Sequence, residues 1–270
     1  GNYDFPINSA EEWPMQAPVD DNATTVTLTS EALLGSLSRS LFATAQEELR
    51  PVMNGIYFDL NQDCLAIVAT DGHKLVRNQM FNVKSDNPAS FIMPKKPATL
   101  LKNVLTKDGG DGIIRFDSRA AEVNFGDGVL YCRLIDGRYP NYNSVIPADN
   151  PNTLTIDRRI LLSAVRRMLP FASEASELIR FHLEPGKLEL SAQDIDFATN
   201  AKEQITCDYN GVMMDIGFKG SSIIEILTNI ECDKVVVLLA DPSRPGVVVP
   251  DNQPDGENIT MLAMPMLLEN

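Results

Sequence analysis

Histidine, tryptophan and long apolar runs are all scarce in this chain of 270 residues. The longest apolar run covers residues 261–268 and is interrupted by Pro265, whereas a membrane-spanning helix needs about 20 apolar residues. We therefore expect no insertion into a membrane. The first residues also lack a basic stretch followed by an apolar one, so no signal peptide is expected.

Metal-binding patterns are missing as well. The sequence has two histidines, His73 and His182, and four cysteines, none of them spaced as Cys-x-x-Cys. This disfavours a structural zinc site, and neither a metal nor a cofactor is expected. Free thiols are typical of proteins in a reducing compartment, which predicts a cytoplasmic location.

Positive charge is also in short supply, because 23 Lys and Arg residues face 37 Asp and Glu residues, giving a net charge of −14. Taken as a sum, this argues against nucleic-acid binding, which usually requires a basic surface. The apolar fraction of 44% is too high for a disordered chain and is sufficient for a buried core. The length exceeds one typical domain of roughly 100–200 residues and suggests two domains.

An internal repeat supports this division. Residues 56–71 align with residues 179–194 at an offset of 123, and the same offset places residues 96–104 on residues 219–227. Two further matches flank these segments, with Thr27–Thr29 resembling Thr153–Thr155 and residues 131–135 resembling residues 260–264. A shared order of motifs over such a distance predicts two tandem copies of one domain.

The predicted boundaries follow from the repeat. We expect one domain over residues 23–148 and a second over residues 149–270, with the junction in a proline-containing segment. Residues 1–22 contain three prolines and five acids but no Lys or Arg, which is typical of a connector.

Each copy is predicted to be α+β, with strands in the majority. A helix starts the copy, with Ser30 or Asp157 as its N-cap, and a pair of alternating strands follows. A further strand leads into a second helix. The copy closes with strands around Asp-Gly turns at residues 111–112, 127–128 and 255–256.

Charge is distributed unevenly between helices and the rest of the chain. The helical windows together hold 10 basic and 3 acidic residues, a charge of +7, whereas the remainder holds 13 basic and 34 acidic residues, a charge of −21. These windows are residues 30–45, 95–107, 157–173 and 218–230. The distribution therefore favours a polyanion-binding surface within an acidic protein.

A helical wheel separates the charged from the apolar residues in two of these windows. The expected buried faces consist of Leu100, Leu101, Val104 and Leu105 in one window, and of Ile160, Leu161, Ala164, Val165 and Met168 in the other. The opposite faces are cationic and carry no aromatic residue, which favours sequence-neutral contact with duplex phosphates over base stacking. A lysine-rich, solvated helix face without a ligand is the alternative.

Residues 69–75, ATDGHKL, contain the only arrangement that suggests catalysis. Asp71 and His73 are an acid and a base two residues apart, and an enzyme of the hydrolase type is the alternative functional hypothesis. Residues at these positions of an Asp-Gly turn are poorly placed to form a dyad, and no nucleophile, P-loop or dinucleotide motif is present. A turn in which Gly72 adopts a positive φ is the favoured interpretation.

Three segments together resemble one family. ATDGHKL at residues 69–75, GRYPNYNSVIP at residues 137–147 and MLAMPMLL at residues 261–268 are similar to signatures of the bacterial DNA polymerase III β subunit, the replicative sliding clamp. The resemblance implies the DNA clamp fold, with helices around a hole for duplex DNA and sheets outside. Such clamps have three tandem domains, and this sequence resembles the second and third, with residues 1–22 as the end of the first.

The resemblance implies a non-catalytic processivity factor with a hydrophobic pocket for short peptides of the polymerase catalytic subunit, the clamp loader and other proteins that carry a clamp-binding motif. The matching pocket positions are Met53, Thr70, Gly72, His73, Lys74, Leu75, Pro140, Val145, Leu262, Met264, Pro265 and Met266. Methionine-rich surfaces accept varied ligands because the thioether side chain adapts its shape. Leu267 replaces a basic residue of the family, and three residues follow it, so the edge of the pocket is expected to differ.

For double-stranded DNA, the charge analysis and the resemblance together select ten residues. These are Arg39, Arg50, Lys95, Lys96, Lys102, Arg158, Arg159, Arg166, Arg167 and Lys219. Pro51 and Val52 stand where aromatic contacts occur in the family, so the loop around Arg50 is expected to contact DNA weakly. Full-length clamps are homodimeric rings closed between the first and third domains, and this chain is therefore expected to be a monomer or a non-native dimer.

Overall fold

The structure, a computed structural model, describes residues 1–12, 18–46 and 49–268. The first half contains the helices α1 (Ser30–Ser40) and α2 (Lys95–Val104). Its strands are β1 (Thr24–Thr29), β2 (Gly55–Leu60), β3 (Leu65–Thr70), β4 (Lys74–Met80), β5 (Ala89–Pro94), β6 (Asp111–Phe116), β7 (Ala120–Phe125) and β8 (Gly128–Arg133).

The second half repeats this series. Its helices are α3 (Arg158–Met168) and α4 (Gly220–Asn229). Its strands are β9 (Asn152–Asp157), β10 (Leu178–Glu184), β11 (Lys187–Asp194), β12 (Thr199–Thr206), β13 (Asp208–Asn210), β14 (Met214–Lys219), β15 (Lys234–Leu239), β16 (Gly246–Pro250), β17 (Glu257–Ala263) and β18 (Pro265–Met266). Short 3-10 helices cover Ala10–Glu12, Leu41–Ala43, Pro51–Asn54, Tyr142–Val145 and Leu169–Phe171.

Strand order shows that the two halves are copies of one architecture. In the first half the strands run β1-β6-β7-β8 and β4-β3-β2-β5, and in the second they run β9-β15-β16-β17 and β12-β11-β10-β14. All neighbours pair antiparallel, and the two helices of each copy pack on each other and on the strands. The predicted repeat and the α+β class are therefore confirmed, whereas the boundaries at residues 23, 148 and 149 stay a prediction.

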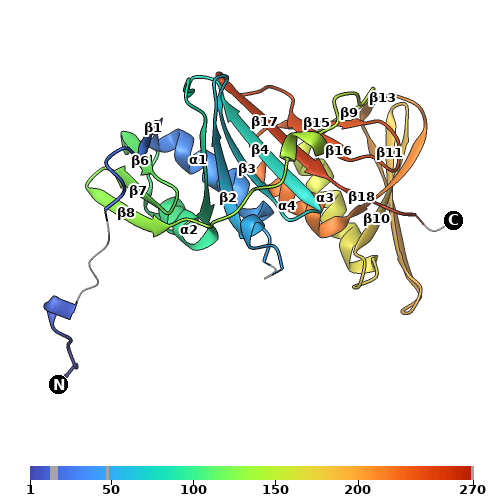
Figure 1. Cartoon of the computed structure of the whole chain (residues 1–270). Coiled ribbons are helices and arrows are strands. Elements are labelled where there is room, and N and C mark those ends of the chain that lie inside the picture. Colours follow the sequence, from blue (N-terminus) through green and yellow to red (C-terminus); the bar gives the residue numbers. More distant parts are fainter. Residues whose placement is uncertain (13–17, 47–48, 269–270) are drawn as a thin grey trace.

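A continuous sheet joins the two copies. β17 of the second copy pairs with β4 of the first over seven residue pairs, from Glu257 opposite Met80 to Ala263 opposite Lys74. The pairing makes one nine-stranded sheet, which crosses the middle of the elongated molecule in Figure 1. The position of β4 relative to β17 is therefore set by backbone hydrogen bonds as well as by side-chain packing.

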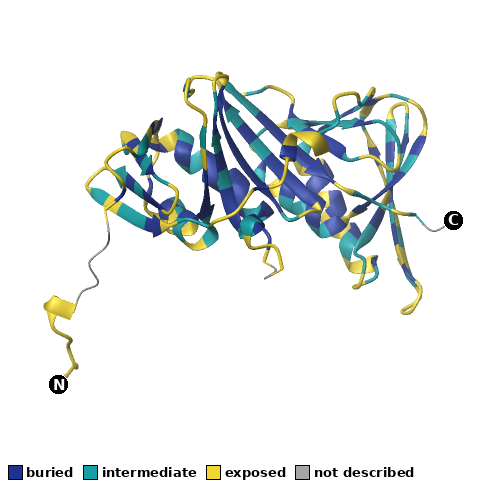
Figure 2. Cartoon of the chain, viewed as in Figure 1, coloured by how far each residue is buried: buried dark blue, intermediate teal, exposed yellow. Residues whose placement is uncertain are grey.

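Three apolar clusters form the interior. Figure 2 shows the buried residues along the strands and helices. One cluster fills each copy. The third lies at the junction, where Leu75 and Leu262 pack together with Tyr139 and Tyr142 from the segment that connects the copies. The ring of Tyr139 stacks on that of Tyr57, with the ring centroids 4.6 Å apart, and the Tyr142 hydroxyl donates to Asp59 at 2.7 Å.

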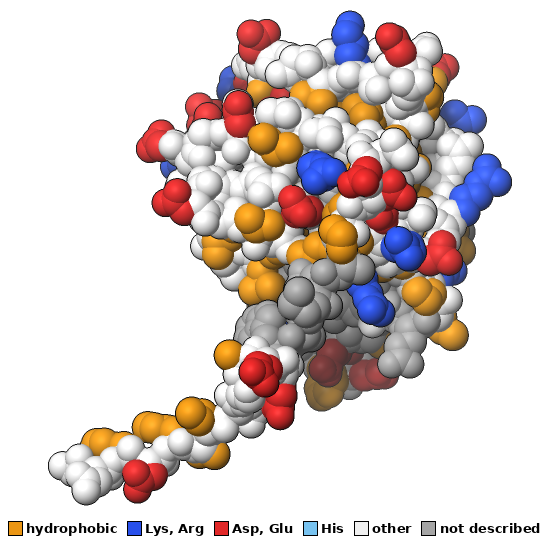
Figure 3. Space-filling model, turned by 60° about the vertical axis from the view of Figure 1, so that its left-hand side comes forward, with side chains coloured by type: hydrophobic (Ala, Val, Ile, Leu, Met, Phe, Trp, Pro, Cys, Tyr) orange, Lys and Arg blue, Asp and Glu red, His pale blue; other side chains and the backbone are white. Residues whose placement is uncertain are grey.

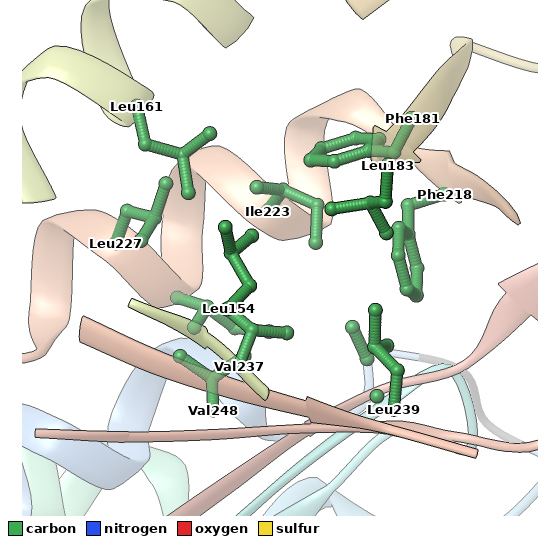
Figure 4. A pocket seen from close by; sticks show the side chains of 13 residues that line it. Leu154, Leu161, Phe181, Leu183, Phe218, Ile223, Leu227, Val237, Leu239 and Val248 are labelled. Atoms are coloured by element: carbon green, nitrogen blue, oxygen red, sulfur yellow. The ribbon is translucent and has the colours of Figure 1, made fainter. Parts of the chain in front are cut away.

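One small cavity of about 20 Å³ remains in the core of the second copy. Its wall is entirely apolar, and Figure 4 shows Leu183, Ile223, Val237 and Val248 among the side chains that point into it. An enclosed apolar space of this size is a packing defect and offers no polar group to orient a ligand.

Several details of the sequence-based interpretation are wrong at helix ends and turns. Thr29, not Ser30, caps α1 by accepting from the Ala32 amide, whereas Asp157 caps α3 as expected. Asp111 and Gly112 lie inside β6 and do not form a turn, because the turn precedes them at Gly110, whose φ is +74°. The second helices start at Lys95 and Gly220, an offset of 125, so residues 96–104 do not align with residues 219–227 at the expected offset of 123.

The predicted buried helix faces are too wide. Leu101 and Leu105 are buried, but Leu100 and Val104 on α2 are 48% and 51% exposed, and Ile160 on α3 is 53% exposed. None of the helices in the described residues is both long enough and apolar enough to cross a membrane.

Candidate peptide groove and cationic helix surface

The β3–β4 turn is an Asp-Gly turn held by its own aspartate. Asp71 Oδ1 accepts hydrogen bonds from the backbone amides of His73 and Lys74, at 2.8 and 2.9 Å, and Gly72 has φ +90°. Only glycine adopts this conformation at little cost, which explains the Asp-Gly sequence. The turn holds His73 exposed at the surface.

Both oxygens of Asp71 are occupied in this turn, since Oδ2 accepts from Lys74 Nζ at 2.6 Å. Burial raises the pKa of Asp71, but the hydrogen bonds from Lys74 and His73 outweigh it and leave the pKa lower than usual. No hydrogen bond joins the Asp71 carboxylate to the His73 ring in the described residues. Asp71 therefore has a structural role, and the geometry of an acid–base dyad is not formed.

Lys74 connects this turn to the second copy. Its Nζ also lies 3.0 Å from Glu225 Oε2 on α4, and the lysine is only 9% exposed. Burial lowers the pKa of Lys74, but its hydrogen bonds to Asp71 and Glu225 outweigh this effect and raise the pKa overall. Sequence reasoning did not select Glu225, because a single acid on a helix without Lys or Arg carries no signal for a partner 151 positions away in the chain.

The segment after β17 lies beside the turn. Met264 donates its amide to the His73 carbonyl at 2.9 Å, and Pro265 then pairs with Phe218 at the open side of β14. Proline is tolerated at such an edge position because it has no amide to donate. The two ends of the sequence-predicted pocket, residues 70–75 and 262–266, are therefore in direct contact.

A groove of about 1210 Å³ runs from this contact across the second copy. His73, Met264, Leu178, Arg180 and Lys219 are among the residues that line it. Pro265, Met266, Leu267, Leu268 and Ser222 also line it. The groove is much larger than the core cavity, and it combines apolar side chains with cationic ones and with the acids Asp194 and Asp196.

The predicted pocket residues differ in accessibility. Leu75 and Leu262 are opposite each other in the sheet and almost completely buried. They therefore pack in the core and are not accessible to a peptide. Thr70 is also buried, and its hydroxyl donates to the Lys74 carbonyl at 2.7 Å. The exposed members are Gly72, His73, Pro140, Val145 and Met264, while Pro265 and Met266 are half-buried.

Met53 is placed under the turn. It is 4% exposed, and its Cε lies 3.9 Å from where a Cβ on Gly72 would stand. Arg50 Nη1 is closer, at 3.2 Å from that position, so the exposed Arg50 lies beside the β3–β4 turn as well as on its own loop. Residues 47–48 of that loop lie outside the described residues.

The cationic helix surface is smaller than predicted. Arg39 does not face outward: it is 8% exposed, and its Nη2 lies 2.8 Å from Glu257 on β17. Arg158 directs its guanidinium to the backbone carbonyls of Cys232 and Leu227, both at 2.8 Å. These two arginines therefore hold the fold together and are not free to contact phosphates.

Two more of the selected bases are paired with acids. Arg167 is bound to Glu203 on β12 at 2.5 Å, and Lys219 lies 3.6 Å from Glu177 and lines the peptide groove. In the described part of the chain, Lys96, Arg159 and Arg166 are exposed and have no ion pair, and Lys95 and Lys102 are half-exposed. These five residues lie on α2 and α3 and form the helix surface that remains available to an anion.

Comparison with known proteins decides the family. The model of the DNA polymerase III beta subunit, central domain, matches residues 27–141, and that of its C-terminal domain matches residues 143–267. The chain belongs to the DNA polymerase III beta subunit family. Members of this family are sliding clamps, which are non-catalytic processivity factors of DNA polymerase III, so the hydrolase alternative based on Asp71 and His73 is not supported.

Individual relatives agree with this assignment. The beta sliding clamp of Caulobacter vibrioides is 27% identical over 263 residues, covering 96% of this chain and 68% of its own length. That of Escherichia coli K12 is 28% identical over 267 residues, covering 98% of this chain and 69% of its own length.

The fold agrees as well. The crystal structure of the Pseudomonas aeruginosa DnaN sliding clamp bound to griselimycin aligns with a TM-score of 0.89 and 27% identity. The alignment covers 96% of this chain and 69% of that clamp. The clamp fold expected from the sequence is therefore confirmed.

Proposed function

We propose that this clamp chain recruits partner proteins through the groove beside His73 and contacts duplex DNA through the exposed bases of α2 and α3. The contact between Met264 and the His73 carbonyl carries the proposal, because it closes the β3–β4 turn onto the C-terminal segment at the junction of the two copies. A structure of a related clamp with griselimycin shows that a member of this family binds a ligand.

The partners follow from this role. A short peptide segment would place apolar side chains against Met264, Val145 and Pro140 and its backbone along the C-terminal segment. We infer that such segments come from the polymerase catalytic subunit, the clamp loader and other proteins with a clamp-binding motif. Replication in bacteria takes place in the cytoplasm, where the chain would act, and full-length clamps would act as homodimeric rings.

For DNA, weak contacts are sufficient in a clamp. A ring that encircles the duplex stays on it by topology, so Lys96, Arg159 and Arg166 need to neutralise phosphates only transiently. Contacts with phosphates carry no sequence information, and this suits a protein that slides.

Fluorescence polarisation with a labelled peptide that carries the clamp-binding motif of a polymerase catalytic subunit tests the groove. We expect saturable binding, at least tenfold weaker in Met264→Asp and moderately weaker in His73→Ala. Met213→Asp is the matched control, because Met213 is an exposed methionine, at 68%, on the β13–β14 loop away from the groove. Equal binding by all variants, or no saturable binding by the unchanged chain, contradicts the proposal.

A further inference from the structure

Arg77 on β4 is half-buried, and its guanidinium forms no ion pair with an acid in the described residues. Its Nη1 donates to Asn143 Oδ1 at 3.2 Å, and its Nη2 donates to Thr260 Oγ1 at 3.4 Å. Its Nε is buried and has no hydrogen-bond acceptor in the described structure. Both acceptors are neutral, so the positive charge is not balanced by the part of the chain that the structure describes.

Other arginines that are shielded from solvent are satisfied differently. Arg39 lies 2.8 Å from Glu257, and Arg158 donates to two backbone carbonyls at 2.8 Å. A charge removed from water without a counter-charge costs free energy, and burial accordingly lowers the pKa of Arg77. The stability of the fold therefore gives no reason for a cation at this position, which points to a partner outside the chain.

Arg77 points away from the helices. Its neighbours Val76 and Asn78 belong to the helix-facing side of β4, where Asn78 Nδ2 donates to Ser36 on α1 at 2.8 Å. Because side chains alternate along a strand, Arg77 lies with Leu75 on the opposite face of the nine-stranded sheet. Duplex DNA held at α2 and α3 would be on the other side, so the anion that Arg77 can reach is one of a partner protein.

The surroundings of Arg77 adjoin the predicted peptide groove. Thr260, opposite Arg77 in the sheet, comes four residues before Met264, a separation of about 13 Å along a strand. Asn143 and the predicted pocket residue Val145 belong to the same 3-10 helix, and both are exposed. The residues that flank a peptide bound at Val145 and Met264 are therefore within reach of Arg77.

We propose that Arg77 and Asn143 form a subsite for an Asp or Glu side chain of the partner, next to the segment that occupies the groove. The carboxylate would accept from both terminal nitrogens of the guanidinium, a charge-assisted contact of defined geometry. Rotation of the exposed Asn143 amide would turn its NH2 group toward the same carboxylate. Thr260 would hold the guanidinium in place, since its hydroxyl accepts from Nη2 and donates to Asn258 at 3.0 Å.

This subsite rests on the proposed function, because the groove must hold the rest of the partner segment. The molecule as a whole disfavours acidic partners, since its net charge is −14 and Figure 3 shows acidic side chains spread over one face. A gain in affinity from an added acid consequently requires a local cation. Asp59, on the same face of the sheet, accepts from the Tyr142 hydroxyl at 2.7 Å and forms no ion pair in the described residues.

Fluorescence polarisation with paired peptides tests the subsite. Each labelled peptide carries the clamp-binding motif of a polymerase catalytic subunit and a short extension of glutamates or of glutamines, at one end or at the other. At one of the two ends, we expect the glutamates to bind about fivefold more tightly than the glutamines. Arg77→Gln should abolish this gain, and Arg77→Lys should keep part of it, because lysine retains the charge without the planar fork.

Asn143→Asp supplies the carboxylate from within the chain. The new acid would stand where Asn143 Oδ1 lies 3.2 Å from Nη1, so it should pair with Arg77, raise the urea midpoint and remove the gain from the glutamates. Asn141→Asp is the matched control, since Asn141 is exposed on the same segment and its side chain makes no capping hydrogen bond. It should leave both the midpoint and the gain unchanged.

A gain from glutamates that persists in Arg77→Gln assigns the acid to another cation, such as Lys219, and overturns the proposal. Equal affinities of the unchanged chain for glutamate and glutamine peptides overturn it as well, as does a large fall in the urea midpoint of Arg77→Gln, which would give Arg77 a structural role. No saturable binding of any peptide contradicts the proposed function and the subsite together, whereas failure of the subsite alone leaves peptide binding intact.

Discussion

Lys74 Nζ lies 2.6 Å from Asp71 Oδ2 and 3.0 Å from Glu225 Oε2, so one buried ammonium group connects the turn that presents His73 to helix α4 of the second copy. Replacing Lys74 by methionine leaves the Asp71 carboxylate, which is 19% exposed, without its charged partner. We expect the free energy of unfolding to fall by about 1–3 kcal/mol and peptide affinity to fall with it.

Urea denaturation and peptide titration measure the two effects. Glu225→Gln should cost less than about 1 kcal/mol, because the carboxylate is nearly half exposed and solvent screens the pair. Lys187→Met is the matched control, since Lys187 pairs with Glu184 at the surface away from the junction. A neutral effect of Lys74→Met on both quantities would show that the ion pairs do not position the turn.

Asp71 predicts a specific pH dependence. The pKa of Asp71 is lowered in the folded chain, so its stabilising contribution is complete above the ordinary value of 3.8 and is lost as the pH falls through the folded-state value. Asp71→Asn should therefore destabilise the chain at pH 7, and the difference between variant and unchanged chain should shrink below about pH 4. Urea denaturation at pH 7, 5 and 3 measures this difference, and a constant difference would contradict the assignment.

Arg39 was selected as a DNA contact, but the structure predicts an effect on stability. Arg39→Met leaves Glu257 without the cation that lies 2.8 Å away in a partly buried site, and we expect a loss of about 3 kcal/mol. Arg166→Ala, at an exposed position, should change stability by less than about 0.5 kcal/mol. Thermal denaturation of both variants separates the roles, and similar melting temperatures would contradict the structural role of Arg39.

The exposed helix surface predicts a change in the salt dependence of DNA binding. If Arg159 and Arg166 each neutralise one phosphate, the double alanine variant should reduce the slope of log K against log salt by about 1.8 for duplex DNA. Arg180→Ala, on a strand that lines the groove, is the control and should leave the slope unchanged. An equal slope for all three proteins would argue against DNA contact through α3.

The apolar cavity in the second copy predicts that a larger side chain can stabilise the protein. Val248→Ile adds one methylene at the wall of the 20 Å³ space shown in Figure 4 and should add up to about 0.8 kcal/mol to the free energy of unfolding. Leu183→Ala, at the same wall, should cost about 2–5 kcal/mol by enlarging the cavity. Destabilisation by Val248→Ile would show that the space is too narrow for the added group.

The sequence predicts the repeat and the β3–β4 turn well because both depend on local patterns. The Asp-Gly sequence at residues 71–72 predicts a turn, and the structure has a turn there. Pro265 favours an edge position, and it lies in the edge strand β18. The family resemblance predicts that residues 70–75 and 262–266 lie side by side. The hydrogen bond between the Met264 amide and the His73 carbonyl agrees with this prediction.

The roles of individual charges could not be predicted in the same way. Arg39 and Arg166 both stand on helices with few acids, but only Arg39 meets an acid from the other copy, Glu257, through the tertiary fold. A helical wheel shows which direction a side chain takes and gives no information on what packs there. The exposure of Leu100 and Val104 could not be predicted for the same reason.

The pairing of β4 with β17 also bears on how the chain folds. Met80 and Glu257 are neighbours in the sheet although 176 residues separate them along the chain, so the first copy keeps an open strand edge until the second is almost complete. Contacts of such long sequence separation slow folding and leave apolar edges accessible in the meantime. The two copies should consequently lose their structure in one cooperative transition, and a protease should release neither of them as a stable half.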